Sequence, residues 1–163
     1  DSRGNPTVEV DVYANYLGEV ILAGRRINDG INEYVATRVV KLMIRKKQQI
    51  SNARILVLGM TFKENCPDIR NSQVPGVINS LCDFGCKVDI LDPWADPDEV
   101  KRCYGFDAVR DFSEIDPEKY DAVVAAVAHR QFAEIEWGKF SKPGRVIFDV
   151  KGFLPGDLID GRL

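Results

Sequence analysis

Four short apolar segments, separated by stretches with helical periodicity, constrain the fold of this chain most strongly. The segments are residues 54–60 (RILVLGM), 87–91 (KVDIL), 122–127 (AVVAAV) and 145–150 (RVIFDV). Continuous apolar runs of this length are typical of strands that are buried on both faces. Helices are predicted between them, near residues 74–84, 96–104 and 131–137. This alternation predicts an α/β fold, a Rossmann-like open parallel sheet with flanking helices on both faces.

The segment that precedes the sheet has two different patterns. Residues 7–13 alternate apolar and polar side chains, as a half-buried strand does, and with residues 19–23 they predict a β-hairpin. Apolar residues then recur at three- and four-residue steps from Ile31 to Met43, which predicts a long linking helix, capped by Asn28 or Asp29 and ending near Gln49. The chain is therefore divided into a hairpin appendage (1–23), a linking helix (24–50) and an α/β domain (51–163).

Composition and charge exclude several classes of function. The net charge is -3, and cations and anions are mixed along the chain, so no basic stripe is present for nucleic acid. No apolar run approaches the roughly 20 residues of a membrane span, and we expect a cytoplasmic protein. The four cysteines form no CxxC pair, so we expect reduced thiols and no metal site. They are Cys66, Cys82, Cys86 and Cys103.

In an open parallel sheet, ligands bind beyond the carboxyl ends of the strands. The segments that follow the four predicted strands are residues 61–72, 92–94, 129–130 and 151–153. The polar residues are densest in the first of these segments, where Lys63 and Arg70 lie seven positions apart, just before a predicted helix N-terminus near residues 72–76. Two cations beside a helix N-terminus favour the binding of a diphosphate. The alternative is a solvated loop in which Asp68 pairs with one of the cations.

The same segment lacks the usual dinucleotide fingerprint. Gly59 is not followed by a second and a third glycine at the spacing of a GxGxxG motif. This half of a Rossmann-type sheet is therefore predicted to bind something other than NAD.

Several motifs resemble one enzyme family. GMTFKENCPDIRNS (residues 59–72) resembles the G-x-x-F-K and D-x-R-x-S signature of the C-terminal UDP-sugar-binding domain in UDP-glucose and UDP-N-acetylhexosamine 6-dehydrogenases. AGRRIND (23–29), DILDPWAD (89–96) and VIFDVKG (146–152) resemble that family's linking helix, second strand and last strand. The resemblance covers about residues 19–163 and is clearest for the bacterial branch of the UDP-ManNAc type, which acts on N-acetylated UDP-sugars.

The resemblance implies roles for particular residues. Phe62 and Lys63 contact the UDP-sugar, through backbone and ammonium, and Lys151 is the candidate for the nucleotide end of the substrate. Arg70 reaches NAD, the cofactor of the parent enzyme, which is bound on another domain. The resemblance also implies polysaccharide biosynthesis and a homodimer or higher oligomer, formed through the linking helix or the hairpin edge.

The departures from the family concern the oxidation chemistry. The sequence has no NAD fingerprint and no cysteine in the GGxC setting that forms the thiohemiacetal and thioester of this reaction. Cys66 lies beside Lys63 but has no nearby base, so it is not a nucleophile. We therefore predict no catalytic residue. The resemblance implies that the chain is the UDP-sugar-binding half of an NAD-dependent oxidoreductase that acts on CH–OH donors, and that this half is inactive alone. Arg25 and Arg26 are candidates for positioning substrate across a dimer interface.

A second resemblance concerns only the N-terminus. Residues 1–13 (DSRGNPTVEVDVY) resemble the N-terminal strand of enolase, whose metal-binding carboxylates and catalytic lysine have no counterparts here. This suggests a chimeric chain. It also raises an alternative function, a chimeric or engineered structural protein that forms a strand-mediated oligomer and binds no ligand. His129, Trp94 and Trp137 are interpreted as incidental or packing residues.

Overall fold

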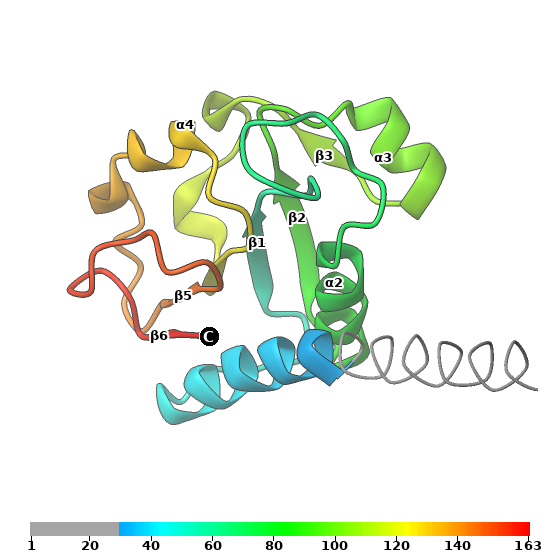
Figure 1. The fold of residues 1–163 in the computed structure, drawn as a ribbon. Helices are drawn as coiled ribbons and strands as arrows, with labels where there is room; N and C mark the ends of the chain where they lie inside the picture. The colour runs from blue at the N-terminus through cyan, green and yellow to red at the C-terminus, as the bar shows by residue number, and fades with distance from the viewer. Residues whose placement is uncertain (1–29) are drawn as a thin grey trace, which may run out of the picture. The chain divides into compact units, whose positions relative to one another are not determined.

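A parallel sheet of six strands forms the centre of the part of the chain that the computed structural model describes, residues 30–163 (Figure 1). The strands are β1 (Arg54–Leu58), β2 (Lys87–Leu91), β3 (Ala108–Val109), β4 (Ala122–Ala125), β5 (Val146–Asp149) and β6 (Gly161–Arg162). Their order is β3-β2-β1-β4-β5-β6, and every neighbouring pair is parallel. The predicted α/β fold is confirmed. The two-residue strands β3 and β6 have no apolar run and were not predicted.

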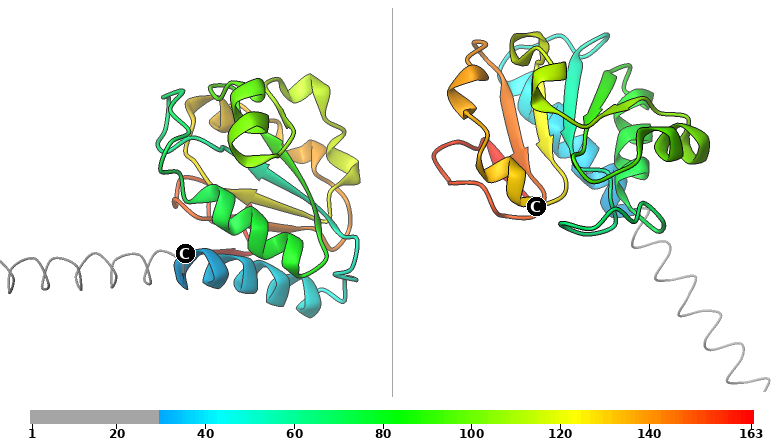
Figure 2. Two further views of the ribbon diagram at one scale, coloured as in Figure 1. Left: turned by 90° about the vertical axis from the view of Figure 1, so that its right-hand side faces the viewer. Right: turned by 90° about the horizontal axis from the view of Figure 1, so that it is seen from above.

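Helices cover both faces of this sheet. A helix over residues 30–45 and α2 (Val74–Asp83) lie on one face, side by side (Figure 2). Helix α3 (Pro97–Tyr104) adds Val100 to the core on that face. The other face is covered by α4 (Arg130–Ala133) and by short 3-10 helices, η1 (Phe112–Glu114), η2 (Pro117–Lys119) and η3 (Trp137–Lys139).

Alternate residues of each central strand belong to two separate hydrophobic cores. Ile55 and Val57 of β1 join the core beneath the helix 30–45 and α2. Leu56 and Leu58 join the core on the other face, which includes Phe132. Because both faces are covered, every second residue is buried on each side, and the strands read as continuous apolar runs in the sequence.

The helix 30–45 and α2 pack closely against each other at Gly76. A Cβ at this position would lie 2.2 Å from Nδ2 of Asn32, too close for a non-bonded contact, so the Asn32 side chain would have to move. Nδ2 of Asn32 also donates a hydrogen bond to the side-chain oxygen of Gln73, 3.3 Å away. Gly76 therefore permits the close packing of α2 against the helix 30–45.

The first described helix ends earlier than predicted, at Arg45 rather than near Gln49. Lys47 adopts a left-handed conformation with φ of 61°, and the N–H of Gln48 donates to the carbonyl of Met43 over 3.0 Å. This is the hydrogen-bond pattern of a Schellman motif, which terminates a helix and satisfies its last carbonyl groups. The apolar pattern does not reveal this turn because Ile50 continues to pack against the same core.

The helix predicted over residues 131–137 is also shorter in the structure. Only residues 130–133 are helical, and η3 follows after a break. Ile135, Trp137 and Phe140 all pack against the core of the second face. Their spacing of two and three residues does not fit a continuous 3.6-residue period, so packing of these side chains ends the helix.

Several predictions fall on residues 1–29, outside the described residues. They are the hairpin of residues 7–23, the helix caps Asn28 and Asp29, the enolase-like residues 1–13, and Arg25 and Arg26. Within residues 30–163, no helix is both long enough and apolar enough to cross a membrane. The four cysteines lie in this part of the chain and are free.

Candidate functional site

The candidate site lies at the carboxyl edge of the sheet, between the neighbouring parallel strands β1 and β4. The order in which strands are added to the sheet reverses at this point. Strands β1 to β3 proceed to one side of this point and β4 to β6 to the other. Such a topological switch point leaves a crevice between neighbouring loops and is the usual ligand position in open α/β sheets. The loop after β1 (residues 59–73, the β1–α2 loop) and the turn after β4 meet there.

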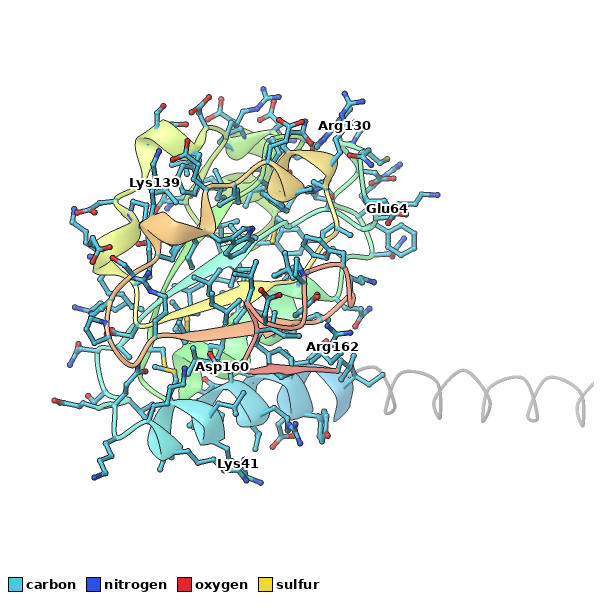
Figure 3. The ribbon with its side chains drawn as sticks, turned by 90° about the vertical axis from the view of Figure 1, so that its left-hand side faces the viewer. Lys41, Glu64, Arg130, Lys139, Asp160 and Arg162 are labelled. Atoms are coloured by element: carbon cyan, nitrogen blue, oxygen red, sulfur yellow. The ribbon has the colours of Figure 1, made fainter. Side chains whose placement is uncertain are left out.

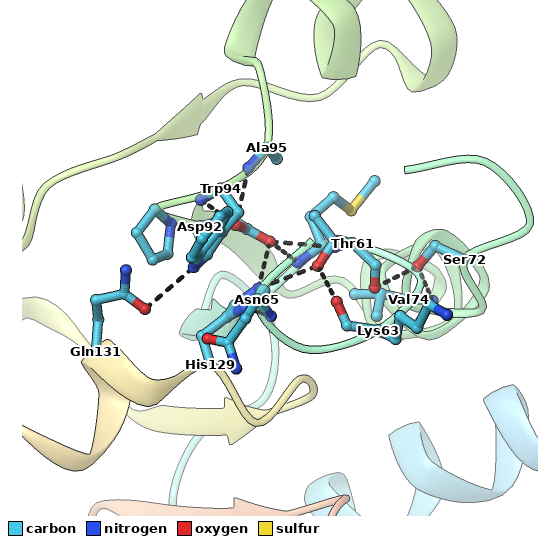
Figure 4. Close-up of polar contacts among 12 residues, drawn as sticks. Thr61, Lys63, Asn65, Ser72, Val74, Asp92, Trp94, Ala95, His129 and Gln131 are labelled. Atoms are coloured by element: carbon cyan, nitrogen blue, oxygen red, sulfur yellow. Dashed lines mark hydrogen bonds and ion pairs between the residues drawn. The ribbon is translucent and has the colours of Figure 1, made fainter. Parts of the chain in front are cut away.

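A buried carboxylate, Asp92, organises this edge. It follows the last residue of β2, is 1% exposed, and accepts hydrogen bonds from three different segments of the chain (Figure 4). The donors are the backbone N–H groups of Met60, Thr61, Trp94 and Ala95 and the ring of His129. Burial opposes ionisation of Asp92, but the hydrogen bonds from His129 and the backbone outweigh it, and the pKa of this carboxyl is lowered.

His129 connects Asp92 to the β1–α2 loop. Its side chain is fully buried; Nδ1 accepts the N–H of Asn65 at 2.9 Å, and Nε2 lies 3.1 Å from both Oδ2 of Asp92 and Oγ1 of Thr61. The interpretation of His129 as an incidental loop residue is therefore wrong. The sequence did not reveal its role because its partners lie more than 30 positions away.

The β1–α2 loop is fixed at its base and near its tip. At the base, the N–H of Phe62 donates to the carbonyl of Asp68 over 2.8 Å. Near the tip, Asn65 adopts a left-handed conformation, and its side-chain oxygen accepts the N–H of Arg130 at 3.1 Å. Glu64 and Arg130 accordingly lie at the same edge of the molecule (Figure 3).

Two of the predicted site residues, Phe62 and Lys63, project from this fixed loop. The ring of Phe62 is 51% exposed. Lys63 is exposed; its charge affects Asp68, but among residues 30–163 no group forms a hydrogen bond or ion pair with its ammonium. Its carbonyl accepts the hydroxyl of Thr61 at 3.0 Å, so the backbone of Lys63 is held although its side chain is not. A held backbone with a free cation is suited to binding an anion.

Arg70 has a different environment in the same loop. Its Nε and Nη2 donate to Oδ1 and Oδ2 of Asp68, each over 2.9 Å. These hydrogen bonds, with a smaller effect of the charge on Lys63, lower the pKa of Asp68 to about 2. The pairing considered as the alternative for this loop, Asp68 with a nearby cation, is therefore present. The Arg70 side chain nevertheless remains 79% exposed.

The N-terminus of α2 does not contribute as predicted. Its first backbone donors are already bonded within the chain: Val74 N to Ser72 Oγ at 3.2 Å, and Gly76 N and Val77 N to the Gln73 carbonyl at 3.1 and 3.4 Å. Pro75 has no N–H. An anion at this edge would therefore be held by Lys63 rather than by backbone donors of the helix.

Lys151, the remaining predicted residue, lies in the loop after β5. Asp149, fully buried at the end of that strand, accepts the N–H groups of Lys151 at 3.1 Å and Gly152 at 2.8 Å through Oδ1, and that of Leu154 at 2.7 Å through Oδ2. Asp92 and Asp149 thus have similar roles. Both stand directly after an apolar strand run, in DILD and VIFD, and this signal could have identified them.

The described residues do not fit the pyrophosphate of NAD. Gly59 has φ of 93°, but a Cβ there would lie 2.4 Å from the Cβ of Val127, so this glycine permits close contact between strands rather than access for a cofactor. The bonded N-terminus of α2 offers no cradle either.

A Rossmann-like sheet with polar loops at its switch point places this part of the chain among the α/β domains that bind ligands at the carboxyl edge of the sheet. Sequence comparison identifies the family. Residues 56–156 match the UDP binding domain of the UDP-glucose/GDP-mannose dehydrogenase family, and the chain belongs to this family. The family resemblance predicted from the motifs is confirmed.

Curated proteins with similar sequences include a UDP-sugar dehydrogenase and a protein named CapL. The chain is 44% identical over 151 residues to UDP-N-acetyl-D-glucosamine 6-dehydrogenase of Salmonella typhi, a match that covers 91% of this chain and 35% of the relative. It is 39% identical over 141 residues to Protein CapL of Staphylococcus aureus, covering 85% of this chain and 32% of that protein. The chain thus spans about a third of the length of these curated relatives.

Solved structures share the fold. The NDP-N-acetyl-D-galactosaminuronic acid dehydrogenase of Methanosarcina mazei Go1 has a TM-score of 0.74 at 18% identity, over 86% of this chain and 30% of that one. The UDP-N-acetyl-mannosamine dehydrogenase Cap5O of S. aureus has a TM-score of 0.68 at 22% identity, over 91% and 33%. These comparisons give no support to a chimeric chain or to the structural alternative.

Proposed function

We propose that the chain is the UDP-sugar-binding C-terminal part of an NAD-dependent UDP-sugar 6-dehydrogenase, and that its β1–α2 loop binds the UDP moiety. The observation that carries this proposal is the exposed ammonium of Lys63, which is free of partners among residues 30–163 while its backbone is fixed. A diphosphate would bind this ammonium directly, through its opposite charge and its acceptor oxygens.

Other residues would complete the site. The N–H of Phe62 is already bonded to Asp68, so Phe62 would contribute its carbonyl and its half-exposed ring. Lys151 would approach the nucleotide from the neighbouring loop, whose backbone Asp149 fixes. Arg70 keeps N–H donors beyond the two bonded to Asp68 and would reach NAD on another domain.

The finer expectations are proposals as well. Relatives named for UDP-N-acetyl-D-glucosamine and UDP-N-acetyl-D-mannosamine support an N-acetylated UDP-hexose as the substrate of the parent enzyme. NAD as its oxidant, a cytoplasmic location, a homodimer or higher oligomer, and the division of the chain at residues 23 and 50 belong to the same proposal.

The experiment that tests it is a titration of the isotopically labelled chain with UDP, followed by backbone amide chemical shifts. Saturable shifts in the β1–α2 loop are expected for the wild type and should be lost in Lys63→Ala. Lys87→Ala is the matched control, because Lys87 is an exposed lysine at the start of β2, on the opposite edge of the sheet. The proposal would be refuted if UDP caused the same shifts in Lys63→Ala as in Lys87→Ala. It would also be refuted if millimolar UDP caused no shifts in the wild type.

A further inference from the structure

His129 and Asn65 form a two-bond connection between the turn after β4 and the β1–α2 loop. The N–H of Asn65 donates to Nδ1 of His129 at 2.9 Å, and the side-chain oxygen of Asn65 accepts the N–H of Arg130 at 3.1 Å. We propose that His129 is a positioning residue for the nucleotide site: its Nε2–H tautomer holds Asn65, and through it the backbone of Lys63. The inference rests on the proposed function of that loop.

The hydrogen-bond network determines which ring nitrogen carries the proton. A backbone N–H can only donate, so Nδ1, which faces Asn65, must be the unprotonated acceptor. The proton of the neutral ring is then on Nε2, which faces Oδ2 of Asp92 and Oγ1 of Thr61, each at 3.1 Å. The Thr61 hydroxyl donates to the carbonyl of Lys63, so its oxygen is free to accept from Nε2. Every donor in this chain of contacts therefore has an acceptor.

The chain of contacts reaches Lys63 from both sides. On its N-terminal side, Thr61 binds the Lys63 carbonyl and is itself held by Asp92 and His129. On its C-terminal side, Asn65 is held by His129 and by Arg130. One imidazole thus touches the residues two positions before and two positions after the lysine, which limits the directions that the Lys63 side chain can take.

Packing alone would not require a histidine at position 129. The ring of His129 also lies edge-on to Phe132, with centroids 5.3 Å apart, so it fills space in the core of the second face. An apolar side chain could supply that contact. It could not accept the N–H of Asn65 or donate to Asp92, and the positioning role is defined by those two bonds.

Two amide substitutions at His129 separate its bond to Asn65 from its bond to Asp92. The side-chain oxygen of asparagine lies as many bonds from Cβ as Nδ1 of histidine, so His129→Asn can still accept from Asn65 but cannot reach Asp92. The amide nitrogen of glutamine lies as many bonds from Cβ as Nε2, so His129→Gln can donate to Asp92 but loses the acceptor for Asn65. Both variants remove the aromatic ring, so neither keeps the edge-on contact with Phe132.

The test is UDP titration of the full 163-residue chain by amide shifts, with wild type and both variants at equal fractions folded. We expect His129→Gln to raise the Kd for UDP about tenfold, the effect of one lost buried hydrogen bond, and His129→Asn to restore most of the affinity. Hydrogen exchange at the Asn65 amide should be faster in the glutamine variant only. Equal Kd values in all three proteins would overturn the positioning role and leave the proposed function intact. No binding by the wild type would overturn both.

A measurement on the wild type tests the inference without any substitution, so it remains possible if the variants do not fold. Nitrogen-15 shifts of the His129 ring should show a protonated Nε2 and an unprotonated Nδ1 at neutral pH. A ring protonated on Nδ1 would contradict the assigned bond to Asn65 and thereby the inference.

Discussion

The backbone of Gly59 lies so close to Val127 that a Cβ at position 59 would be 2.4 Å from the Cβ of Val127. Gly59 follows β1 and Val127 lies just beyond β4, the two strands that border the switch point. Gly59→Ala should therefore force these segments apart and strain a backbone with φ of 93°. We expect the free energy of unfolding, measured in urea, to fall by about 3 kcal/mol, since both overpacking and a left-handed alanine contribute.

Gly105→Ala is the control for the strain alone. Gly105, which ends α3, has φ of 77°, but apart from its chain neighbours no residue lies within 4 Å of the place that a Cβ would take, so only the conformational penalty of about 1 kcal/mol applies. Equal losses of stability in the two variants would show that the contact with Val127 has no energetic importance.

Asp92→Asn should be among the most destabilising single changes in the domain. The carboxylate accepts five hydrogen bonds, and an amide would direct its own N–H groups at some of these donors. We expect a loss of about 3 kcal/mol in urea-induced unfolding at neutral pH, since hydrogen bonds to charged groups are the stronger ones. Near-wild-type stability would show that the loops are held by other contacts.

The same carboxylate predicts a dependence of stability on pH. Its pKa is lower in the folded chain than in the unfolded chain, so folding favours the ionised form. This contribution is complete above the unfolded pKa of about 3.9 and is lost as the pH falls through the folded pKa. Unfolding free energies measured between about pH 6 and pH 3 should therefore fall less steeply for Asp92→Asn than for the wild type.

Asp68→Asn is the matched control for this titration. The pKa of Asp68 is also lowered, to about 2, by its hydrogen bonds to Arg70, but this pair is at the surface. Salt screens such pairs, so the control should show a smaller change in the pH dependence, and one that disappears at high ionic strength. A larger effect from Asp68 than from Asp92 would contradict this ordering.

The sequence predicted those parts of the structure that depend on the pattern of a few consecutive residues. Continuous apolar runs identify β1, β2, β4 and β5 because burial on both faces removes polar residues from them. Lys63 could be selected because it lies in a polar loop directly after such a run. His129 could not, because its surroundings are built from loops that follow three different strands, and no local pattern records their meeting. The end of the first helix was missed because Lys47 is not a residue type that signals a left-handed turn.

Asp149→Asn should weaken both the fold and the proposed site. Asp149 accepts N–H groups through both carboxylate oxygens, whereas an amide has only one oxygen, so at least one buried donor loses its acceptor. We expect the free energy of unfolding to fall by about 2 kcal/mol and the affinity for UDP to fall with it. Lys151→Ala separates the effects, because removing an exposed side chain should change stability by less than about 0.5 kcal/mol and still reduce UDP binding. Wild-type affinity in Asp149→Asn would show that the geometry of this loop is unimportant for the ligand.

The last strand should depend on one carboxylate, Asp160. Its Oδ1 lies 2.6 Å from the ammonium of Lys46, at the end of the first described helix, and its Oδ2 accepts the N–H of Ile147 at 2.9 Å. Lys46 also donates to the carbonyl of Arg145, so these contacts connect β6, β5 and the helix. Asp160→Ala removes an ion pair and leaves a partly buried N–H without its acceptor.

We expect Asp160→Ala to lower the free energy of unfolding by about 1 to 2 kcal/mol, most of it from the unpaired N–H, because the ion pair is about a third exposed and partly screened. The amide of Ile147 should exchange faster in hydrogen-exchange measurements. Glu136→Ala is the matched control, because it breaks a more exposed pair with Lys139 and should change stability by less than about 0.5 kcal/mol. If Lys46→Met reproduced the full loss seen in Asp160→Ala, the contacts of the Lys46 ammonium with Asp160 and Arg145, rather than the bond to Ile147, would be the important ones. If neither changed stability, β6 would be held by its backbone pairing with β5 alone.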